Sequence, residues 1–358
     1  MRLEGLRRER ALASKQYRDG TFHNTAPVTA GLDGNQLKIM REFLFGGSKR
    51  KPPGAVPVDS PLEAWTKPVG SSGLRVTWLG HSTMLLELDG RRVITDPVFG
   101  NRLGPVSFMG PRRLHVAPVA VAQLPALDAV LVSHDHYDHL CKATVIELAQ
   151  RGVPFITSLG VGAHLESYGI PAAQITELDW WESHSLPGGE LAFTATPAQH
   201  FSGRLGGRNG TLWSSWSIRS ANHHIFFSGD TGLTPEFTEI GQRLGPFDLT
   251  MLEIGAWHPA WGTIHLGPEN ALTAFEMLGK GTLLPVHWST FDLGLHPWAQ
   301  PAETLLALAA QRGVRVITPR LGAPFEPSLV EGPTAWWREV TGEVDTAEAR
   351  PLVQEVAG

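Results

Sequence analysis

Short apolar runs separated by polar turns dominate the chain from residue 74 onward. Such runs predict β-strands, and here they fall at residues 74–79, 84–88, 91–95, 129–133, 191–195, 224–228, 249–254 and 283–286. Asp89-Gly90 suits a type I′ turn and predicts a hairpin between the second and third runs. Apolar positions at helical spacing predict helices over residues 143–150, 268–278 and 302–311. Strands and helices mix along the chain, so the predicted class is α/β or α+β.

The two ends of the chain lack this pattern. We therefore expect an N-terminal extension over residues 1–60, one folded domain over residues 61–326, and a C-terminal tail over residues 327–358 that packs on the domain or trails from it. Residues 1–51 carry a net charge of +6, whereas the remainder carries −11. The basic N-terminal region could make peripheral contact with an anionic membrane; the alternative is a solvated arm.

Composition narrows the class of protein. A 358-residue chain with 42% hydrophobic and 18% charged residues has a globular balance. Its single cysteine, Cys141, excludes an internal disulfide framework and a thiolate zinc cluster. No run of about 18 apolar residues and no secretory signal is present, so we expect a cytoplasmic protein. The net charge of −5 argues against a nucleic-acid partner, because phosphate binding needs concentrated Lys and Arg.

Fifteen histidines stand out in this composition, and four metal-ligand side chains gather in one short segment. His134, His136, Asp138 and His139 follow directly after the predicted strand at residues 129–133. In extended backbone His134 and His136 share a face, whereas Asp138 and His139 follow a bend and can face a second point. Nitrogen and oxygen donors of this kind suit zinc, with manganese and iron as alternatives.

One segment cannot fill two coordination spheres, so further ligands should come from other strand ends. Three polar residues each follow an apolar run: His200, Asp230 and His287. A lone histidine at a strand end is more often a structural residue than a ligand. Three ligand-type residues that close separate strands, together with the cluster at 134–139, favour a metal site built from loops at one sheet edge.

Seven short peptides form a distinctive set in this chain: residues 78–83 (WLGHST), 95–97 (TDP), 109–111 (MGP), 177–182 (ELDWWE), 229–232 (GDTG), 245–249 (GPFDL) and 287–291 (HWSTF). Together with the His-x-His-x-Asp-His motif, they make the chain resemble the metallo-β-lactamase-fold hydrolases, and within them the N-acylphosphatidylethanolamine-hydrolysing phospholipase D family. The motif is shared across the wider superfamily, whereas the set of peptides is more specific. The resemblance covers residues 72–325.

The resemblance implies an α/β fold, the four-layer αβ/βα sandwich with two packed mixed sheets and helices outside. It also implies two zinc ions. His134, His136 and His200 would hold the first ion, Asp138, His139 and His287 the second, and Asp230 would bridge them. The implied reaction is attack of a metal-bridging hydroxide on a phospholipid phosphodiester.

Three further residues are candidates for roles around the ions. His265, at the place of a functional histidine in the family, could protonate the leaving group and so join Asp138 and Asp230 as a catalytic residue; the alternative is an ordinary polar loop residue. Asp96 and His81 could orient the ligands by hydrogen bonding to them from behind, or could fix the turn backbone instead.

Other functions compatible with this pattern are a metal-dependent lactonase or another small-molecule hydrolase of the same fold. A nuclease is disfavoured by the acidic body of the chain. A non-enzymatic protein that keeps a relic site is disfavoured by the complete ligand set.

Overall fold

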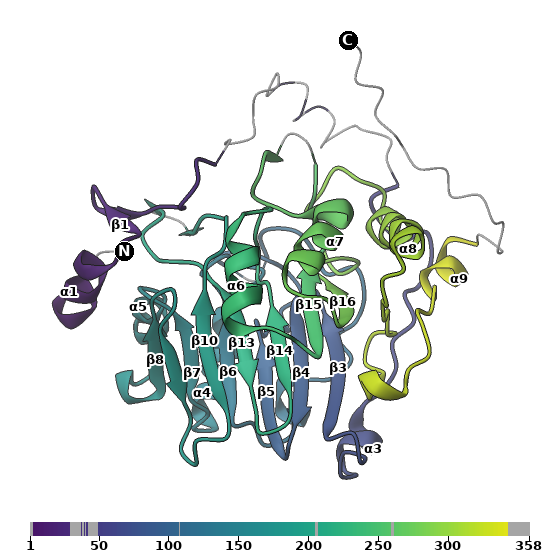
Figure 1. Ribbon diagram of the computed structural model, residues 1–358, viewed down its shortest axis with the longest axis horizontal. Helices are drawn as coiled ribbons and strands as arrows, with labels where there is room; N and C mark the ends of the chain where they lie inside the picture. Colours follow the sequence, from purple (N-terminus) through teal and green to yellow (C-terminus); the bar gives the residue numbers. More distant parts are fainter. Residues whose placement is uncertain are drawn as a thin grey trace.

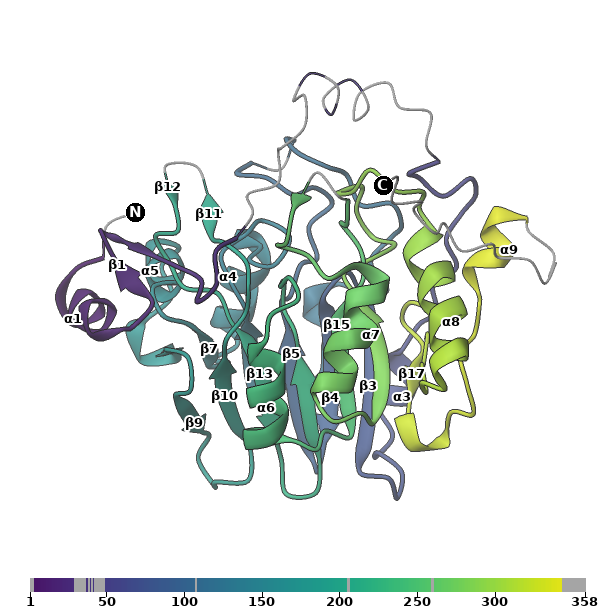
Figure 2. The same cartoon turned by 45° about the horizontal axis from the view of Figure 1, so that its top comes forward.

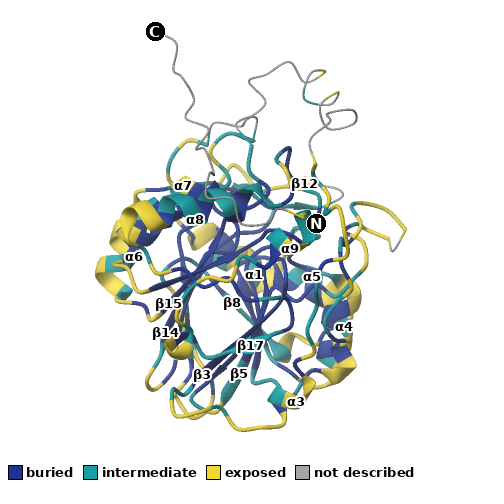
Figure 3. Cartoon of the chain, turned by 90° about the vertical axis from the view of Figure 1, so that its right-hand side faces the viewer, coloured by how far each residue is buried: buried dark blue, intermediate teal, exposed yellow. Residues whose placement is uncertain are grey.

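Two β-sheets lie face to face at the centre of the computed structural model, and helices cover their outer sides (Figure 1). The structure describes residues 3–28, 37, 39, 41, 49–106, 108–204, 207–258 and 261–342. Seen along the layers, the two sheets form buried slabs with exposed helices outside them (Figure 3). The predicted α/β class and the sandwich of two mixed sheets flanked by helices are confirmed.

The first sheet has seven strands in the order β17-β3-β4-β5-β6-β7-β8. Strands β3, β4 and β5 form an antiparallel meander, whereas β5 to β8 run parallel. The bounds are β17 (Pro324–Phe325), β3 (Leu74–Gly80), β4 (Thr83–Leu88), β5 (Arg91–Thr95), β6 (Ala129–Val132), β7 (Phe155–Ser158) and β8 (Ile175–Leu178).

The second sheet has six strands in the order β16-β15-β14-β13-β10-β9. Strands β14, β15 and β16 are parallel, and β10 runs in the same direction because both β10 and β14 are antiparallel to β13. The bounds are β16 (Thr282–Val286), β15 (Leu249–Glu253), β14 (His224–Phe227), β13 (Ser215–Arg219), β10 (Ala192–Thr196) and β9 (Ser183–Ser185). Two small hairpins pair β1 (Tyr17–Arg18) with β2 (Thr21–Phe22) and β11 (Gly203–Arg204) with β12 (Gly207–Arg208).

Helices close both outer faces (Figures 1 and 3). The second sheet is covered by α6 (Glu236–Leu244), α7 (Gly267–Met277) and α8 (Gln300–Arg312), and the first by α4 (Lys142–Gln150) and α5 (Gly162–Ser167). Shorter helices are α1 (Gly5–Ala13), α3 (Leu62–Trp65) and α9 (Trp337–Thr341), with 3-10 turns at Val121–Gln123, Ala172–Gln174 and Pro327–Leu329. No described helix has the length and apolar character needed to cross a membrane.

Most central strands are buried on both faces and are largely apolar, because both faces of each sheet are covered. In β4, Met84 and Leu86 point into the core between the sheets, whereas Leu85 packs in a second core under α4 with Val130 and Phe155. All five side chains are fully buried. This burial on both faces explains why the strands appear in the sequence as continuous apolar runs rather than as an alternation of polar and apolar positions.

The described parts of both ends pack against this sandwich. Trp336 and Trp337 are buried, and their rings contact Trp288. Trp337 also donates a hydrogen bond from its indole nitrogen to Glu303 on α8, at 2.6 Å. At the other end, Arg7 of α1 pairs with Glu177 at 2.7 Å. Residues 327–342 thus dock on the sandwich, while residues 343–358 lie outside the described residues.

Candidate metal centre

The carboxyl ends of β6, β10, β14, β15 and β16 meet at one edge of the sandwich, and a chemically dense cluster lies there. The segment after β6 makes a tight turn, in which the main-chain N–H groups of His139 and Leu140 both donate to the carbonyl oxygen of His136. This turn separates His134 and His136 from Asp138 and His139. The four ligand-type side chains therefore point to two places rather than one, as the bend in the sequence predicts.

The first group is built from residues that follow strands of both sheets. His134, His136, His200 and Asp230 each offer one ligand atom, and these atoms all lie within 4.8 Å of one another. Nε2 of His134 lies 2.9 Å from Nδ1 of His136, and Nε2 of His200 lies 3.3 Å from that same Nδ1. Three imidazoles and a carboxylate at this separation are a donor set suited to a divalent transition metal.

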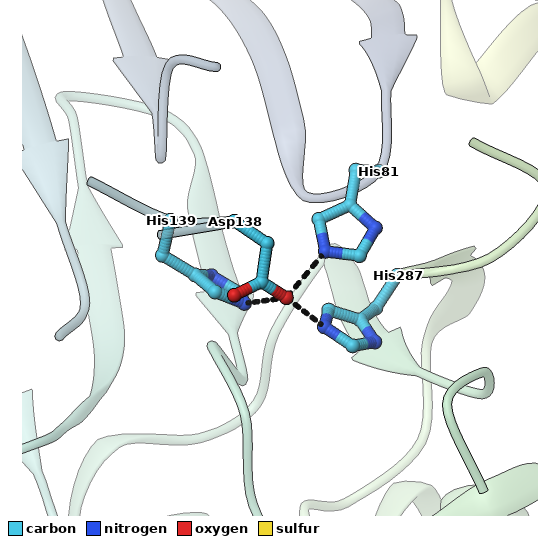
Figure 4. Close-up of side chains that lie close together, drawn as sticks. All are labelled: His81, Asp138, His139 and His287. Atoms are coloured by element: carbon cyan, nitrogen blue, oxygen red, sulfur yellow. Dashed lines mark hydrogen bonds and ion pairs between the residues drawn. The ribbon is translucent and has the colours of Figure 1, made fainter. Parts of the chain in front are cut away.

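The second group surrounds the Asp138 carboxylate (Figure 4). Its Oδ2 atom lies 3.0 Å from Nε2 of His81, 3.3 Å from Nε2 of His287 and 3.5 Å from Nε2 of His139. The ligand atoms of these four residues also lie within 4.8 Å of one another.

Asp230 lies between the two groups. Its Oδ1 atom is 3.1 Å from Nε2 of His139 and 3.1 Å from Nε2 of His287, in the second group. Its Oδ2 atom instead faces the first group, 3.6 Å from Nε2 of His200 and 3.9 Å from Nε2 of His134. One carboxylate thus presents one oxygen to each group, which is the arrangement that a bridging ligand requires.

Two tests on these residues support metal binding. Nε2 of His139 and Oδ1 of Asp230 are buried without a hydrogen-bond partner, and coordination would satisfy both atoms. Burial opposes ionisation, but Asp230 and Asp138 raise the pKa of His287 to about 10. The carboxylates thus make the site favourable for positive charge, which a metal ion would supply in place of a proton.

The protonation states of two other residues in the cluster, His134 and Asp138, are also those that metal binding requires. Burial, together with His139, lowers the pKa of His134 well below its ordinary value, so this imidazole is neutral and free to coordinate. Burial alone would raise the pKa of Asp138, but His139 and His287 hold it well below its ordinary value, so the carboxylate is ionised. Neutral imidazole and ionised carboxylate are the forms that bind metal.

Asp96 and His81 contact two of the candidate ligands, His139 and Asp138. Asp96 is fully buried at the end of β5; it accepts hydrogen bonds from His139 Nδ1 at 2.7 Å and from the Ser133 hydroxyl at 2.6 Å. Burial, together with His287, lowers the pKa of His81 to about 3, so its neutral ring donates to Asp138. Both residues have positive φ angles, 34° for Asp96 and 56° for His81, a sparsely populated conformation often found at functional sites.

His265 lies beside the cluster, paired with a residue that the sequence did not single out. Its Nδ1 atom is 2.7 Å from Oε2 of Glu253, at the end of β15. Glu253 is fully buried, and its Oε1 atom accepts a hydrogen bond from the main-chain N–H of Thr231 at 2.8 Å. Burial opposes the effect, but Glu253 raises the pKa of His265. The signal available in the sequence was a lone acid at the end of an apolar strand, the position also held by Asp230 and His287.

Two cationic side chains, Arg204 and Arg208, contact residues that neighbour the cluster. Arg204 donates to the carbonyl oxygen of Leu140 at 3.0 Å, and its guanidinium lies 3.9 Å from the centre of the Tyr137 ring. It therefore braces the ligand-bearing turn from outside. Arg208 is exposed and lies over Phe201, whose ring contacts His136. Arg208 is thus placed to meet an anionic group that approaches the cluster.

Similarity to known proteins indicates the family of this chain. Residues 91–288 match the family described as Beta-lactamase superfamily domain. The chain is 47% identical to an uncharacterised protein of Mycobacterium tuberculosis over 91% of this chain and 88% of that protein. It is 35% identical to N-acyl-phosphatidylethanolamine-hydrolyzing phospholipase D 1 of Caenorhabditis elegans, over 72% of this chain and 77% of that protein. The structure of a metallo-hydrolase from Ignicoccus hospitalis shares the fold, with a TM-score of 0.55, 24% identity, and coverage of 71% and 98% of the two chains.

Proposed function

Because the chain belongs to the metallo-β-lactamase superfamily, as a metal-dependent hydrolase close to the N-acylphosphatidylethanolamine-hydrolysing phospholipase D family, we propose that it is a dinuclear zinc phosphodiesterase of phospholipase D type. Its substrates would be N-acylphosphatidylethanolamine-like phospholipids. The observation that carries the proposal is Asp230, whose two carboxylate oxygens face two separate ligand groups. The name of the nematode relative supports the choice of substrate.

The proposed ligands lie within the groups that the geometry brings together, of which His81, Glu253 and His265 are also members. His134, His136 and His200 would hold one ion, Asp138, His139 and His287 the other, and Asp230 would join them. A pair of divalent ions supplies a nucleophile from water at neutral pH and neutralises charge that develops on a phosphoryl group. Asp96 and His81 would keep His139 and Asp138 oriented for this task.

His265 is the proposed source of the proton for the leaving alkoxide. Its Nδ1 atom is bound to Glu253, which leaves Nε2 as the nitrogen that can release a proton toward the leaving oxygen. Burial opposes the effect, but Glu253 raises the pKa of His265, which favours the protonated ring that a proton donor requires. Arg208 would attract the phosphodiester by charge. Any peripheral membrane contact of the N-terminal region would use exposed cations among its described residues, such as Arg8, Lys15 and Arg18. Arg7 and Arg10 instead pair with acids of the sandwich.

The test is hydrolysis of N-acylphosphatidylethanolamine in mixed micelles by the zinc-loaded protein, with products identified by mass spectrometry. We expect phosphatidic acid and an N-acylethanolamine from the parent protein. His136→Ala should release neither product. His184→Ala removes a partly exposed histidine on the edge strand β9 and should behave as the parent.

Three other results would change the proposal. Hydrolysis of a generic phosphodiester without hydrolysis of the lipid would keep the chemistry and discard the substrate. Turnover of a lactone alone would identify a lactonase. Failure of the parent protein to bind any divalent metal would contradict the proposal as a whole.

A further inference from the structure

The N-terminal segment, residues 3–28, is built into the sandwich rather than laid over it. Arg7 of α1 pairs with Glu177 and also with Glu166, at 2.7 Å and 3.0 Å, and its side chain is only 16% exposed. Phe22 of β2 is fully buried in a cluster with Trp213 and Leu212. Its main-chain N–H donates to the carbonyl oxygen of Asn209 at 2.8 Å. These contacts fix the chain that immediately follows, which approaches the metal centre.

The packing of the N-terminal segment places Asn24 next to the metal centre. Its side-chain amide donates from Nδ2 to the main-chain carbonyl of His200 at 2.7 Å. Its Oδ1 atom accepts from the main-chain N–H of the same His200 at 3.0 Å. Oδ1 also accepts from the indole N–H of Trp213 at 3.1 Å. Both main-chain groups of one proposed ligand are therefore held by a single side chain from the other end of the sequence.

His200 needs such support because it lies in the loop that follows β10, where no strand or helix fixes its backbone. Its ring is oriented separately, since Nδ1 lies 2.9 Å from the carbonyl oxygen of Ile264. That contact leaves Nε2 directed toward His136 and Asp230. The ring rotation thus depends on Ile264, whereas the position of the backbone that carries the ring depends on Asn24.

We propose that Asn24 is a positioning residue of the metal centre, which holds the backbone of His200 so that this ligand reaches the ion shared with His134 and His136. The proposal rests on the ligand role of His200 in the proposed function. Groups that orient a metal ligand from behind typically change metal affinity about 10- to 100-fold when removed. A side chain that only stapled the N-terminal segment would change stability and leave the affinities of the two ions in their original ratio.

The experiment measures Co²⁺ binding to the full-length chain, by visible absorption and by competition with a chromophoric chelator. For Asn24→Ala we expect one of the two ions to bind about 10- to 100-fold more weakly with an altered visible spectrum, while the other ion keeps its affinity. The matched control is Asn222→Ala. Asn222 also uses its side-chain amide, on Asp89, but it lies in the turn before β14, at the edge opposite the metal centre. This control should keep both affinities and the parent spectrum.

If Asn24→Ala does not fold, Asn24→Asp takes its place, because it keeps an acceptor for the His200 N–H and loses the donor to the His200 carbonyl. The same selective loss of one ion is then expected. Parent affinities and spectrum in the folded variant, or equal weakening of both ions, would overturn the proposal. Phospholipid turnover plays no part in this measurement, so a wrong substrate leaves it intact. Failure of the parent chain to bind Co²⁺ would overturn this proposal together with the proposed function.

Discussion

At the scale of single residues, three buried carboxylates each contact a histidine of the candidate centre. Asp96, Asp230 and Glu253 are at most 3% exposed, and each contacts at least one histidine at 3.1 Å or less. Burying an ionised group is costly unless it is paired or bound to a metal, so each of these acids needs the contacts that it makes here. Glu253 is the informative case, because its only histidine contact within hydrogen-bonding distance is the proposed proton donor, His265.

Glu253→Gln tests that pairing. Glutamine keeps the size of the side chain but removes the charge that raises the pKa of His265. We expect kcat for the phosphodiester to fall about 10- to 100-fold at unchanged metal content. Steady-state kinetics with metal analysis checks this, with Glu239→Gln on the exposed face of α6 as the control. A parent-like kcat in the variant with its full metal content would show that Glu253 has no role in catalysis.

At the scale of elements, loops that carry ligands are packed directly against one another. Gly232 follows Asp230; its main-chain N–H donates to the carbonyl oxygen of Gln199 at 2.8 Å. The side-chain amide of Gln199 donates in turn to the carbonyl oxygen of Thr263, at 2.9 Å. The loops that carry Asp230, His200 and His265 therefore share one network. A Cβ atom on Gly232 would lie 1.7 Å from the carbonyl oxygen of Thr263, so only glycine allows this approach.

Gly232→Ala should force these loops apart. Overpacking of this kind costs about 1–3 kcal/mol of stability, and here it would also displace His265. We expect lower unfolding free energy in urea and reduced turnover. Gly210→Ala is the matched control, because a Cβ atom there meets nothing within 4 Å. Unchanged stability and turnover in Gly232→Ala would show that the loops move apart at no cost.

A second link between elements lies at the opposite edge of the sandwich. Asp89, in the turn between β4 and β5, accepts hydrogen bonds from the Ser220 hydroxyl at 2.6 Å and the main-chain N–H of Asn222 at 2.8 Å. His223 Nδ1 lies 3.1 Å from the same carboxylate. Burial alone would raise the pKa of Asp89, but the hydrogen bonds from Ser220 and Asn222 hold it below its ordinary value. This contact joins the first sheet to the second.

Asp89→Asn should therefore destabilise the protein in a pH-dependent way. A depressed pKa in the folded state means that the ionised carboxylate contributes stability above the unfolded pKa of about 3.9. That contribution disappears as the pH falls through the lower folded pKa. We expect a gap of about 1–2 kcal/mol between parent and variant at neutral pH. Urea unfolding of metal-free protein at decreasing pH should show the gap shrinking below about pH 4; a gap that widens would contradict the assignment.

At the scale of the whole molecule, the metal centre connects the two sheets. The turn after β6 in the first sheet supplies His134, His136, Asp138 and His139. The loops after β10, β14 and β16 in the second sheet supply His200, Asp230 and His287. The strand ends converge at one edge of the sandwich, and Figure 2 shows that edge turned toward the viewer with its long connecting loops. Bound ions would thus cross-link the two layers.

Removal of metal should consequently destabilise the entire sandwich rather than one loop. An ion present at about 1,000 times its dissociation constant contributes about 4 kcal/mol to folding. We expect chelation to lower Tm and abolish hydrolysis, and Zn²⁺ to restore both. Differential scanning calorimetry of loaded and stripped protein checks the effect. Equal Tm values with and without bound metal would contradict a cross-linking role.

The sequence by itself determined eight strands of the two sheets, the histidine-rich turn and the family, because these depend on local patterns. The predicted strand at residues 91–95 matches β5 at both ends, and the others differ by a residue or so. Strands β7, β8, β9 and β13 and helices α5 and α6 were not predicted, although several of them have apolar positions that the fold buries, such as Trp216 in β13 and Phe237 in α6. Their patterns are short, and short patterns are ambiguous without neighbours.

Only the tertiary structure decided which further residues support the predicted centre. In the sequence, Glu253 is only the last residue of an apolar strand, and Asn24 is only part of an extension without a pattern. The fold places Glu253 against His265 and Asn24 against His200. Similarly, the division of Asp230 between two ligand groups depends on how the two sheets stack. Local patterns encode which face of an element is buried. Contacts between distant elements depend on sheet order and packing, which no short stretch of sequence contains.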